Sequence, residues 1–422
     1  MKKVNHKHLF VAKMTHLASV LYAGAILASC IAISACSTGG SSTSTNPQTQ
    51  QIQTMLESTA NYYLSLESAA SYKPSGIQLN ASCPNMNPVT WVHGTFGHNN
   101  LQLVTQNSIF QLGSITKSFT SVVMLQLLSE KNLSLDSNIK SLAPLLAARY
   151  PQWELITIRQ LLNMTSGIPD YSEQDAFTTD AFNNPTAFMP LSQVLGYAES
   201  LPFKFAPGTS YNYSNTNYTL LEEAIIEISG HPFESEINQR IINKLGLTNL
   251  HYPPNQPTAV ANPAQIVYGY AGAGWAPYAG TEILPPYSLS YANAGGAIIS
   301  NANDLNSYIH TLFTPNGLLS PSQLSALISP VSMTTGQPLN YPLAPGERAF
   351  GLGVMAMNLS NSFANLPLIY LYTGETFGFL GMYAYDANTG ISMSMTINSS
   401  SSRITMNQLI IDLNNLVEIC KQ

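Results

Sequence analysis

The chain has 422 residues and a hydrophobic content of 45%, which excludes an intrinsically disordered protein and allows one large core or two interleaved domains. Only 9% of the residues are charged, so surface ion pairs cannot be a major source of stability. The formal net charge is −6, and the first 35 residues hold four lysines and no acid, so the remainder of the chain is near −10, which argues against a nucleic-acid partner.

The N-terminal segment has the layout of a bacterial lipoprotein signal peptide. A basic stretch is followed by an apolar stretch from Leu17 to Ala35, and the residues just before Cys36 resemble a lipobox. We therefore predict a signal peptide over residues 1–35, a lipid on Cys36, and a flexible Ser/Thr/Gly-rich tether over residues 36–50. Ser37 is typical of sorting to the outer membrane, which would place the protein in the cell envelope, facing the periplasm. The alternative is an uncleaved membrane anchor, because the 19 residues from Leu17 to Ala35 nearly suffice to span a bilayer.

Hydrophobic spacing predicts helices and strands near both ends of the remaining chain and a mostly helical middle. The expected helices are 50–66, one that opens at Ser114, 221–229, 234–246, 301–313 and 403–420. The expected strands are 76–83, 89–97, 350–357 and 367–398. The stretch 260–290 is rich in Gly, Pro and aromatic residues without a period, and we interpret it as loops around a cleft.

This order of elements predicts an α/β (α+β) fold. Both chain ends complete one antiparallel sheet, which is flanked by the N- and C-terminal helices. The sheet domain is expected over residues 51–112 and 290–422, and an inserted all-helical domain is expected over residues 113–289.

The motif Ser114-Ile115-Thr116-Lys117 opens a long apolar helix. A serine and a lysine three residues apart on a helix lie on the same face, so the amine can take the proton from the hydroxyl. A second S-x-x-K occurs at Ser137 and Lys140, in a short polar stretch that we interpret as solvated surface.

Two further motifs follow the first. Tyr213-Ser214-Asn215 lies 99 residues after Ser114, and Tyr372-Thr373-Gly374-Glu375 lies 159 residues after Tyr213. Y-x-N also occurs at Tyr291 to Asn293, so no single motif is decisive. The evidence is the occurrence of all three motifs in this order.

The ordered set resembles the serine penicillin-recognising enzymes, the group of class C β-lactamases, D-alanyl-D-alanine carboxypeptidases and family VIII-like esterases. That family carries S-x-x-K, then Y-x-N, then K-T-G or H-x-G. Four further segments are similar to the family: 156–171, 207–249, 294–305 and 350–354. The resemblance covers the chain from about residue 52 to the C-terminus and implies a β-lactamase/DD-peptidase-like fold with the site in a groove between the two parts.

The resemblance also implies roles for the motif residues. Ser114 would be the nucleophile that forms an acyl-enzyme, Lys117 its base, and Tyr213 the proton relay to the leaving group. Asn215 would hold the substrate's carbonyl and Lys117. The residues Tyr372, Thr373, Gly374 and Glu375 would bind substrate, with the backbone N–H groups of Ser114 and Glu375 as the oxyanion hole.

Two positions depart from the family pattern. Tyr372 stands where the family has Lys or His, and a neutral phenol recognises a substrate carboxylate less well than a cation does. Met164 stands where family members often have His, at a position to which we assign no role.

The cysteines of the mature chain are Cys83, Cys420 and the lipidated Cys36. The resembled fold brings its first strand and its last helix onto one sheet, which implies a Cys83–Cys420 disulfide in an oxidising compartment. Two buried free thiols are the alternative.

We therefore expect a lipid-anchored serine hydrolase that acts on amide or ester bonds of a small peptide, β-lactam or ester substrate. A D-alanyl-D-alanine carboxypeptidase-like or related acyl hydrolase is favoured over a true β-lactamase. The scattered histidines form no H-x-x-x-H pair, so we expect no metal and no cofactor. The sequence contains no G-x-S-x-G motif, which argues against an α/β-hydrolase. A monomer is expected, and a non-catalytic module that binds peptidoglycan or a protein is the alternative function.

Overall fold

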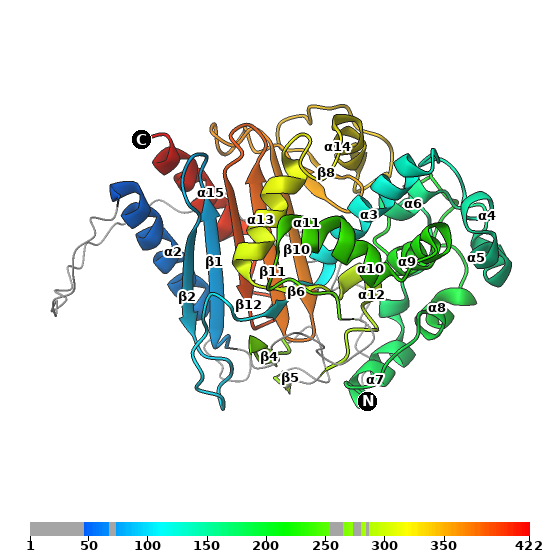
Figure 1. The fold of residues 1–422 in the computed structure, drawn as a ribbon, viewed down its shortest axis with the longest axis horizontal. Coiled ribbons are helices and arrows are strands. Elements are labelled where there is room, and N and C mark those ends of the chain that lie inside the picture. The colour runs from blue at the N-terminus through cyan, green and yellow to red at the C-terminus, as the bar shows by residue number, and fades with distance from the viewer. Residues whose placement is uncertain (1–45, 67–72, 254–264, 273–279, 284–286) are drawn as a thin grey trace.

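The computed structural model describes residues 46–66, 73–253, 265–272, 280–283 and 287–422 (Figure 1). The predicted signal peptide, Cys36 and about half of the expected loop region 260–290 lie outside the described residues, and so do the first residues of the predicted tether. None of the helices within the described ranges is both long enough and apolar enough to cross a membrane.

Eight strands of the described residues form one antiparallel sheet in the order β2-β1-β12-β11-β10-β9-β8-β7. Their bounds are β1 Gly76–Ser82, β2 Val89–Gly94, β7 Val331–Ser332, β8 Arg348–Phe350, β9 Met355–Met357, β10 Ile369–Thr376, β11 Phe379–Asp386 and β12 Ser392–Ile397. The first strand pairs with the last, with Leu79 opposite Met395. Both chain ends therefore complete the same sheet, as the order of elements predicts.

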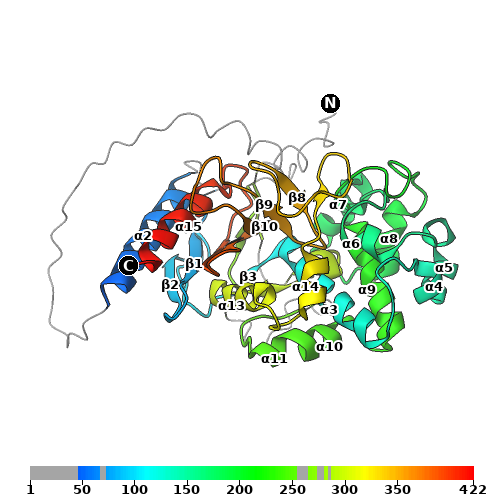
Figure 2. The same cartoon turned by 90° about the horizontal axis from the view of Figure 1, so that it is seen from above.

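Helices cover both faces of the sheet, which explains why the central strands are buried along their whole length. Helices α2 (Pro47–Ser65) and α15 (Asn407–Cys420) lie side by side on one face (Figure 2). Helix α13 (Ala302–Phe313) lies on the other face, where Ser394 Oγ of β12 donates to the carbonyl of Ala302 (2.6 Å). The alternation of Ser and Met along β12 thus puts the small hydroxyls toward α13 and the methionines toward the opposite face.

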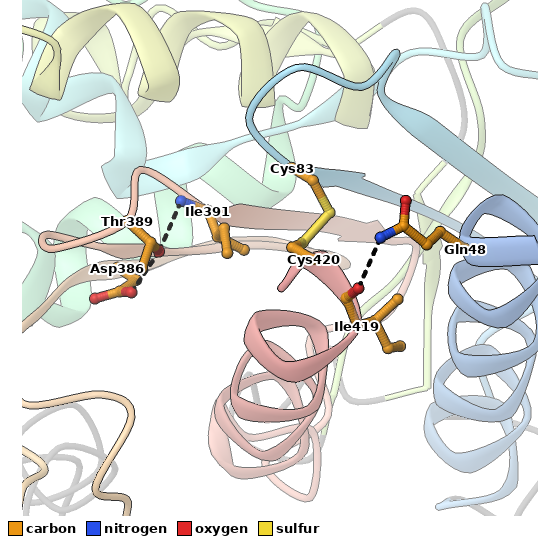
Figure 3. Close-up of a disulfide and its surroundings, with 7 residues drawn as sticks. All are labelled: Gln48, Cys83, Asp386, Thr389, Ile391, Ile419 and Cys420. Carbon is orange, nitrogen blue, oxygen red and sulfur yellow. Dashed lines mark hydrogen bonds between the residues drawn. A yellow bond between two sulfur atoms is a disulfide. The ribbon is translucent and has the colours of Figure 1, made fainter. Parts of the chain in front are cut away.

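A disulfide ties the C-terminal helix to the sheet. Cys83, just after β1, is joined to Cys420, the last residue of α15, across 337 positions of sequence (Figure 3). Beside it, Gln48 Nε2 of α2 donates to the carbonyl of Ile419 (3.2 Å). The first and last helices and the first strand are therefore linked at one end of the molecule.

The helical part of the molecule surrounds α3 (Thr116–Glu130), whose residues are almost all buried. Apolar and small polar residues alternate around this helix, so it has no solvent face and takes a central position. Around it lie α4 Ile139–Leu142, α5 Pro144–Arg149, α6 Ile158–Leu162, α7 Asp175–Asn183, α8 Leu191–Glu199, α9 Thr216–Ser229, α10 Phe233–Ile237, α11 Asn243–Leu245, α12 Asn293–Gly296 and α14 Pro321–Leu327. The predicted boundaries between the sheet domain and the helical domain remain a prediction.

Two short strands join the helical part to the sheet. β3 (Phe110–Gln111) enters just before Ser114, and β6 (Ile299–Ser300) leaves just after α12, and the two pair with each other. This pairing brings the start of α3 and the turn of α12 together, although they are about 180 residues apart in sequence. In the predicted loop region, the described residues form a second pair, β4 (Gly269–Tyr270) with β5 (Glu282–Ile283).

Candidate active site

Ser114 lies in a single 3₁₀ turn, Gly113–Ile115, directly before α3. The sequence predicts a helix that opens at Ser114, whereas the α-helix begins at Thr116. Gly113 has a φ of +52°, and a Cβ built on it would lie 2.6 Å from the backbone nitrogen of Glu375. Glycine is therefore required here both by the backbone conformation and by the approach of β10.

Lys117 is fully buried one helical turn from the serine. Its Nζ has three partners: Asn215 Oδ1 (2.7 Å), the carbonyl of Gly295 (2.7 Å) and Ser114 Oγ (3.2 Å). Burial lowers the pKa of Lys117 to about 7, although the negative charge of Asp170 acts in the opposite direction. A large share of Lys117 is therefore neutral near neutral pH, as a base must be.

Tyr213 completes the contact at the serine. Its hydroxyl donates to Ser114 Oγ (2.7 Å), and Nζ of Lys117 lies 4.9 Å from the centre of its ring. Burial raises the pKa of Tyr213 above its usual value, so the phenol stays protonated. The three residues that the motifs predict, Ser114, Lys117 and Tyr213, are thus brought together, and Tyr213 is a donor toward the serine oxygen.

The α12 turn supplies the carbonyl that binds Lys117. The amide nitrogen of Ala294 donates to Glu222 Oε2 of α9 (2.7 Å), and Thr120 Oγ1 of α3 donates to the carbonyl of Ala294 (2.7 Å). These bonds hold the carbonyl of Gly295 against Lys117. Burial raises the pKa of Glu222 to about 7, against the effect of its two hydrogen-bond donors.

Asn215 sits at the start of α9, and its amide is fully engaged within the protein. Its Oδ1 accepts from Lys117, while its Nδ2 donates to Asp170 Oδ2 (3.0 Å) and to Ser172 Oγ (3.1 Å). Both amide hydrogens thus have acceptors within the protein, and that Asn215 also holds a substrate carbonyl remains a prediction. The predicted contact with Lys117 is present.

Strand β10 passes directly beside the serine turn. A Cβ on Gly374 would lie 2.8 Å from the backbone nitrogen of Ser114, so any larger residue would push the strand away. This close approach puts the backbone of Glu375 next to that of Gly113. The geometry fits the predicted pairing of the Ser114 and Glu375 N–H groups as an oxyanion hole, with Thr373 and Glu375 partly exposed.

A family model described as Beta-lactamase matches residues 86–415 of the chain. The chain belongs to the beta-lactamase family. The resemblance seen in its motifs is thereby confirmed, and with it the assignment to a group of serine hydrolases that includes penicillin-binding proteins.

Curated relatives of this family match part of the chain. Penicillin-binding protein 4* of Bacillus subtilis (strain 168) is 27% identical over 267 residues, which are 59% of this chain and 55% of that protein. The D-alanyl-D-alanine-carboxypeptidase/endopeptidase AmpH of Escherichia coli (strain K12) is 29% identical over 151 residues, or 35% of this chain and 38% of that protein. The chain thus spans about 40 to 55% of the length of these relatives.

Solved structures match the beta-lactamase fold over most of the chain. A D-stereospecific amidohydrolase from Streptomyces sp. has a TM-score of 0.66 at 25% identity and covers 84% of this chain and 98% of that one. The D-amino acid amidase from Ochrobactrum anthropi SV3, complexed with L-phenylalanine amide, has a TM-score of 0.69 at 19% identity and covers 89% and 99%. The predicted mixed α/β fold of the β-lactamase/DD-peptidase type is confirmed.

Tyr372, the departure from the pattern of the beta-lactamase family, is buried beside Tyr213. Only 1% of its surface is exposed, its ring lies 6.0 Å from that of Phe350, and its hydroxyl interacts with that of Tyr213. Burial and the neighbouring Tyr213 raise its pKa well above the usual value. Tyr372 is as buried as Lys117 and lies beside Tyr213, and that it binds substrate remains a prediction.

Arg348 of β8 is the cation nearest to Tyr372 in sequence. It lies opposite Met357 of β9, which in turn lies opposite Ile369 of β10, three residues before Tyr372. At about 3.3 Å per residue along a strand and about 4.8 Å between strands, the backbone of Arg348 is offset from that of Tyr372 by about 10 Å in both directions.

The second S-x-x-K lies away from Ser114, whereas the second Y-x-N, Tyr291 to Asn293, leads into the α12 turn. Lys140 has a side chain that is 61% exposed and forms a surface ion pair with Glu154, as expected for solvated residues.

Met164 is buried, and its Sδ accepts from the backbone nitrogen of Ser214 (3.4 Å). This contact supports the loop that carries Tyr213, which is a structural role.

Several residues of the site were not identified from the sequence. Asp170, Ser172 and the carbonyl of Gly295 contact the motif residues, and all three lie in segments whose similarity to the beta-lactamase family was noted or directly follows. The similarity of these segments to the family indicates that they lie near the site, but it does not show which atoms contact the motif residues. A contact through a backbone carbonyl cannot be predicted from residue type, because every residue has one.

Proposed function

We propose that this protein is a serine hydrolase that forms an acyl-enzyme on Ser114 and acts on amide or ester bonds. The observation that carries the proposal is the arrangement of Lys117 Nζ and the Tyr213 hydroxyl on two sides of Ser114 Oγ. A D-alanyl-D-alanine carboxypeptidase-like or related acyl hydrolase is favoured over a β-lactamase.

The contacts of Lys117 fit the first proton transfer. A neutral amine has two N–H bonds and one lone pair, and the two shorter contacts, to Asn215 Oδ1 and Gly295 O, use both N–H bonds. The lone pair is then directed at Ser114 Oγ, the third and longer contact. Since the Tyr213 hydroxyl donates to the same oxygen, the proton of Ser114 is left to point at Lys117.

In the acylation step, Ser114 Oγ bonds to the substrate's carbonyl carbon and gives its proton to Lys117. The carbonyl oxygen takes the negative charge beside the N–H groups of Ser114 and Glu375. The bond to the leaving amine or alcohol then breaks, Tyr213 passes its proton to the leaving group, and Lys117 replaces that proton. Water hydrolyses the ester in the second half, which releases the acid and returns the proton to Ser114.

The substrate class follows from the neutral side chain of Tyr372 on β10. Penicillins and D-alanyl-D-alanine peptides both carry a carboxylate, whereas the position that would meet it holds the buried phenol of Tyr372. Within the favoured group, this points to the related acyl hydrolases, which act on esters or amides without a carboxylate at that point, rather than to a D-alanyl-D-alanine carboxypeptidase.

The location is also a proposal. The lipobox-like residues before Cys36, the basic start and the tether over residues 36–50 support a lipid anchor in the envelope, with Ser37 favouring the outer membrane. The curated relatives named as penicillin-binding proteins are consistent with an envelope location. A monomer remains our expectation.

Mass spectrometry after exposure to a fluorophosphonate, and separately to a penicillin, tests the function. We expect the fluorophosphonate adduct on Ser114, with no adduct in Ser114→Ala and an unchanged adduct in Ser137→Ala, which removes the serine of the second S-x-x-K. Labelling that persists in Ser114→Ala would contradict the proposal. A folded wild-type protein that takes no label would favour the non-catalytic binding module.

A further inference from the structure

Asp170 is a buried acid beside the site that the proposed reaction has not used. It is 3% exposed and lies directly before the 3₁₀ turn Tyr171–Glu173. Its Oδ1 accepts from the backbone nitrogen of Ser172 (3.0 Å), and its Oδ2 accepts from Asn215 Nδ2 (3.0 Å). A buried carboxylate is costly unless such donors satisfy it, so its place beside the site needs a reason.

The contacts of Asp170 decide which way the Asn215 amide points. The amide has two hydrogens and one carbonyl oxygen, and the hydrogens face two acceptors, Asp170 Oδ2 and Ser172 Oγ. Turning the amide over would place its oxygen against the carboxylate and its hydrogens against the ammonium of Lys117. Because both contacts would be repulsive, the observed orientation is the stable one in the presence of the Asp170 charge.

We propose that Asp170 is a positioning residue for acylation: its carboxylate fixes the Asn215 amide so that Oδ1 holds Lys117 against Ser114. The same negative charge also favours the protonated form of Lys117. The proposal rests on the proposed function. Asp170 does not contact the serine or a substrate, so it acts through Asn215 and is not itself catalytic.

The charged and titratable groups around this network are few within the described residues. Lys117 faces the rings of Tyr213 and Tyr218 (4.9 and 5.3 Å from Nζ) and, across the amide, Asp170. Asp170 is flanked by Glu173 and Tyr171, of which Glu173 Oε2 forms a surface pair with Lys204 (2.7 Å). Burial raises the pKa of Asp170, and its hydrogen bonds with Ser172 and Asn215 lower it.

The sign of the electrostatic effect is fixed. The negative charge of Asp170 raises the pKa of Lys117, against the stronger effect of burial. Replacing Asp170 by the neutral, isosteric Asn removes this contribution, so Lys117 loses its proton at lower pH. Since the neutral amine is the base, the rise of the acylation rate with pH then moves to lower pH as well.

The test measures the rate of fluorophosphonate labelling of Ser114 against pH for the full-length protein. For Asp170→Asn we expect the acid limb at lower pH than in wild type, and a plateau rate about tenfold lower, which corresponds to one weakened charge-assisted hydrogen bond. Glu173→Gln is the matched control: it removes one acid from the same turn without touching Asn215, and we expect a wild-type profile.

A second variant tests the orientation of the Asn215 amide separately from the charge of Asp170. Ser172→Ala removes the second acceptor of the amide at a partly exposed position and should lower the plateau several-fold without moving the acid limb. An unchanged plateau would contradict the role of amide orientation, even if Asp170→Asn does not fold. A folded Asp170→Asn whose acid limb coincides with wild type overturns the inference alone. Wild type that fails to label overturns the proposed function and this inference with it.

Discussion

Gly374 approaches Leu112 so closely that a β-carbon on Gly374 would lie 1.8 Å from the carbonyl oxygen of Leu112. The contact joins β10 to the chain just before the serine turn, and it sets the distance between Glu375 and Ser114. Gly374 of the third motif therefore acts through its backbone alone, by allowing β10 to come this close to the serine turn.

We predict that Gly374→Ala disrupts catalysis. The methyl group must displace β10, which moves the Glu375 N–H from the place where the oxyanion forms, and loss of one such donor costs about 10²- to 10³-fold in kcat. Ester hydrolysis and thermal unfolding should be measured together. Gly196→Ala in α8 is the control, since a Cβ there meets nothing within 4 Å, and it should be neutral or stabilising. Wild-type activity in Gly374→Ala would refute the close approach.

A second prediction concerns pH. Because burial lowers the pKa of Lys117 to about 7 and only the neutral amine is a base, kcat/KM for an ester should fall about tenfold per pH unit below pH 7 and level off above it. Lys117→Arg should abolish activity, since a guanidinium keeps its proton. Lys140→Arg, in the exposed second motif, should leave the profile unchanged. A profile that is flat between pH 5 and 8 would argue against Lys117 as the base.

The buried hydroxyl of Tyr372 leads to a third prediction. We expect slow or undetectable turnover of penicillins alongside measurable hydrolysis of nitrophenyl acetate or butyrate. Tyr372→Phe removes only a hydroxyl that interacts with the hydroxyl of Tyr213, so it should reduce ester hydrolysis less than Tyr213→Phe, which removes the donor to Ser114 Oγ itself.

Restoring a cation is the complementary test. Tyr372→His or Tyr372→Lys should raise the rate with β-lactams relative to the ester by about one to two powers of ten, the equivalent of a charge-assisted hydrogen bond of roughly 1.5–3 kcal/mol. Side-by-side kinetics decide the matter. Wild-type penicillin turnover at rates typical of β-lactamases, unchanged by Tyr372→His, would show the electrostatic reasoning to be wrong.

The disulfide gives a fourth prediction. Thiol titration of the unfolded, unreduced protein should find neither Cys83 nor Cys420 free. Cys420→Ser should lower the free energy of unfolding by up to a few kcal/mol, because the bond closes a very long loop in the unfolded chain. The double variant with Cys83→Ser should match the single one. Two free thiols in the unreduced wild type would contradict the pairing.

The last prediction concerns the N-terminus, outside the described residues. Labelled palmitate should be incorporated through Cys36, and the chain of a Cys36→Ser variant should stay unprocessed. Processing that continues normally at a site before residue 36 would instead indicate an ordinary signal peptide.

Local patterns in the sequence were sufficient to predict most elements of the sheet and its terminal helices. Strand alternation and the apolar stripes of α2 and α15 are set by neighbouring residues, so they can be read without the fold. The same holds for Ser114 and Lys117, because helical geometry alone brings residues three apart onto one face. The family resemblance added the order of the three motifs.

Tertiary structure decided the rest. The sequence cannot show that Tyr213 reaches Ser114 across 99 residues, since that contact depends on the path of the chain between them. It cannot show the Gly295 carbonyl at Lys117, because every residue has a backbone carbonyl and only its position makes it a ligand. The burial of Tyr372 and the link from Asp170 through Asn215 to Lys117 are likewise properties of packing between distant segments, where burial and hydrogen-bond partners, not residue type, determine the chemistry.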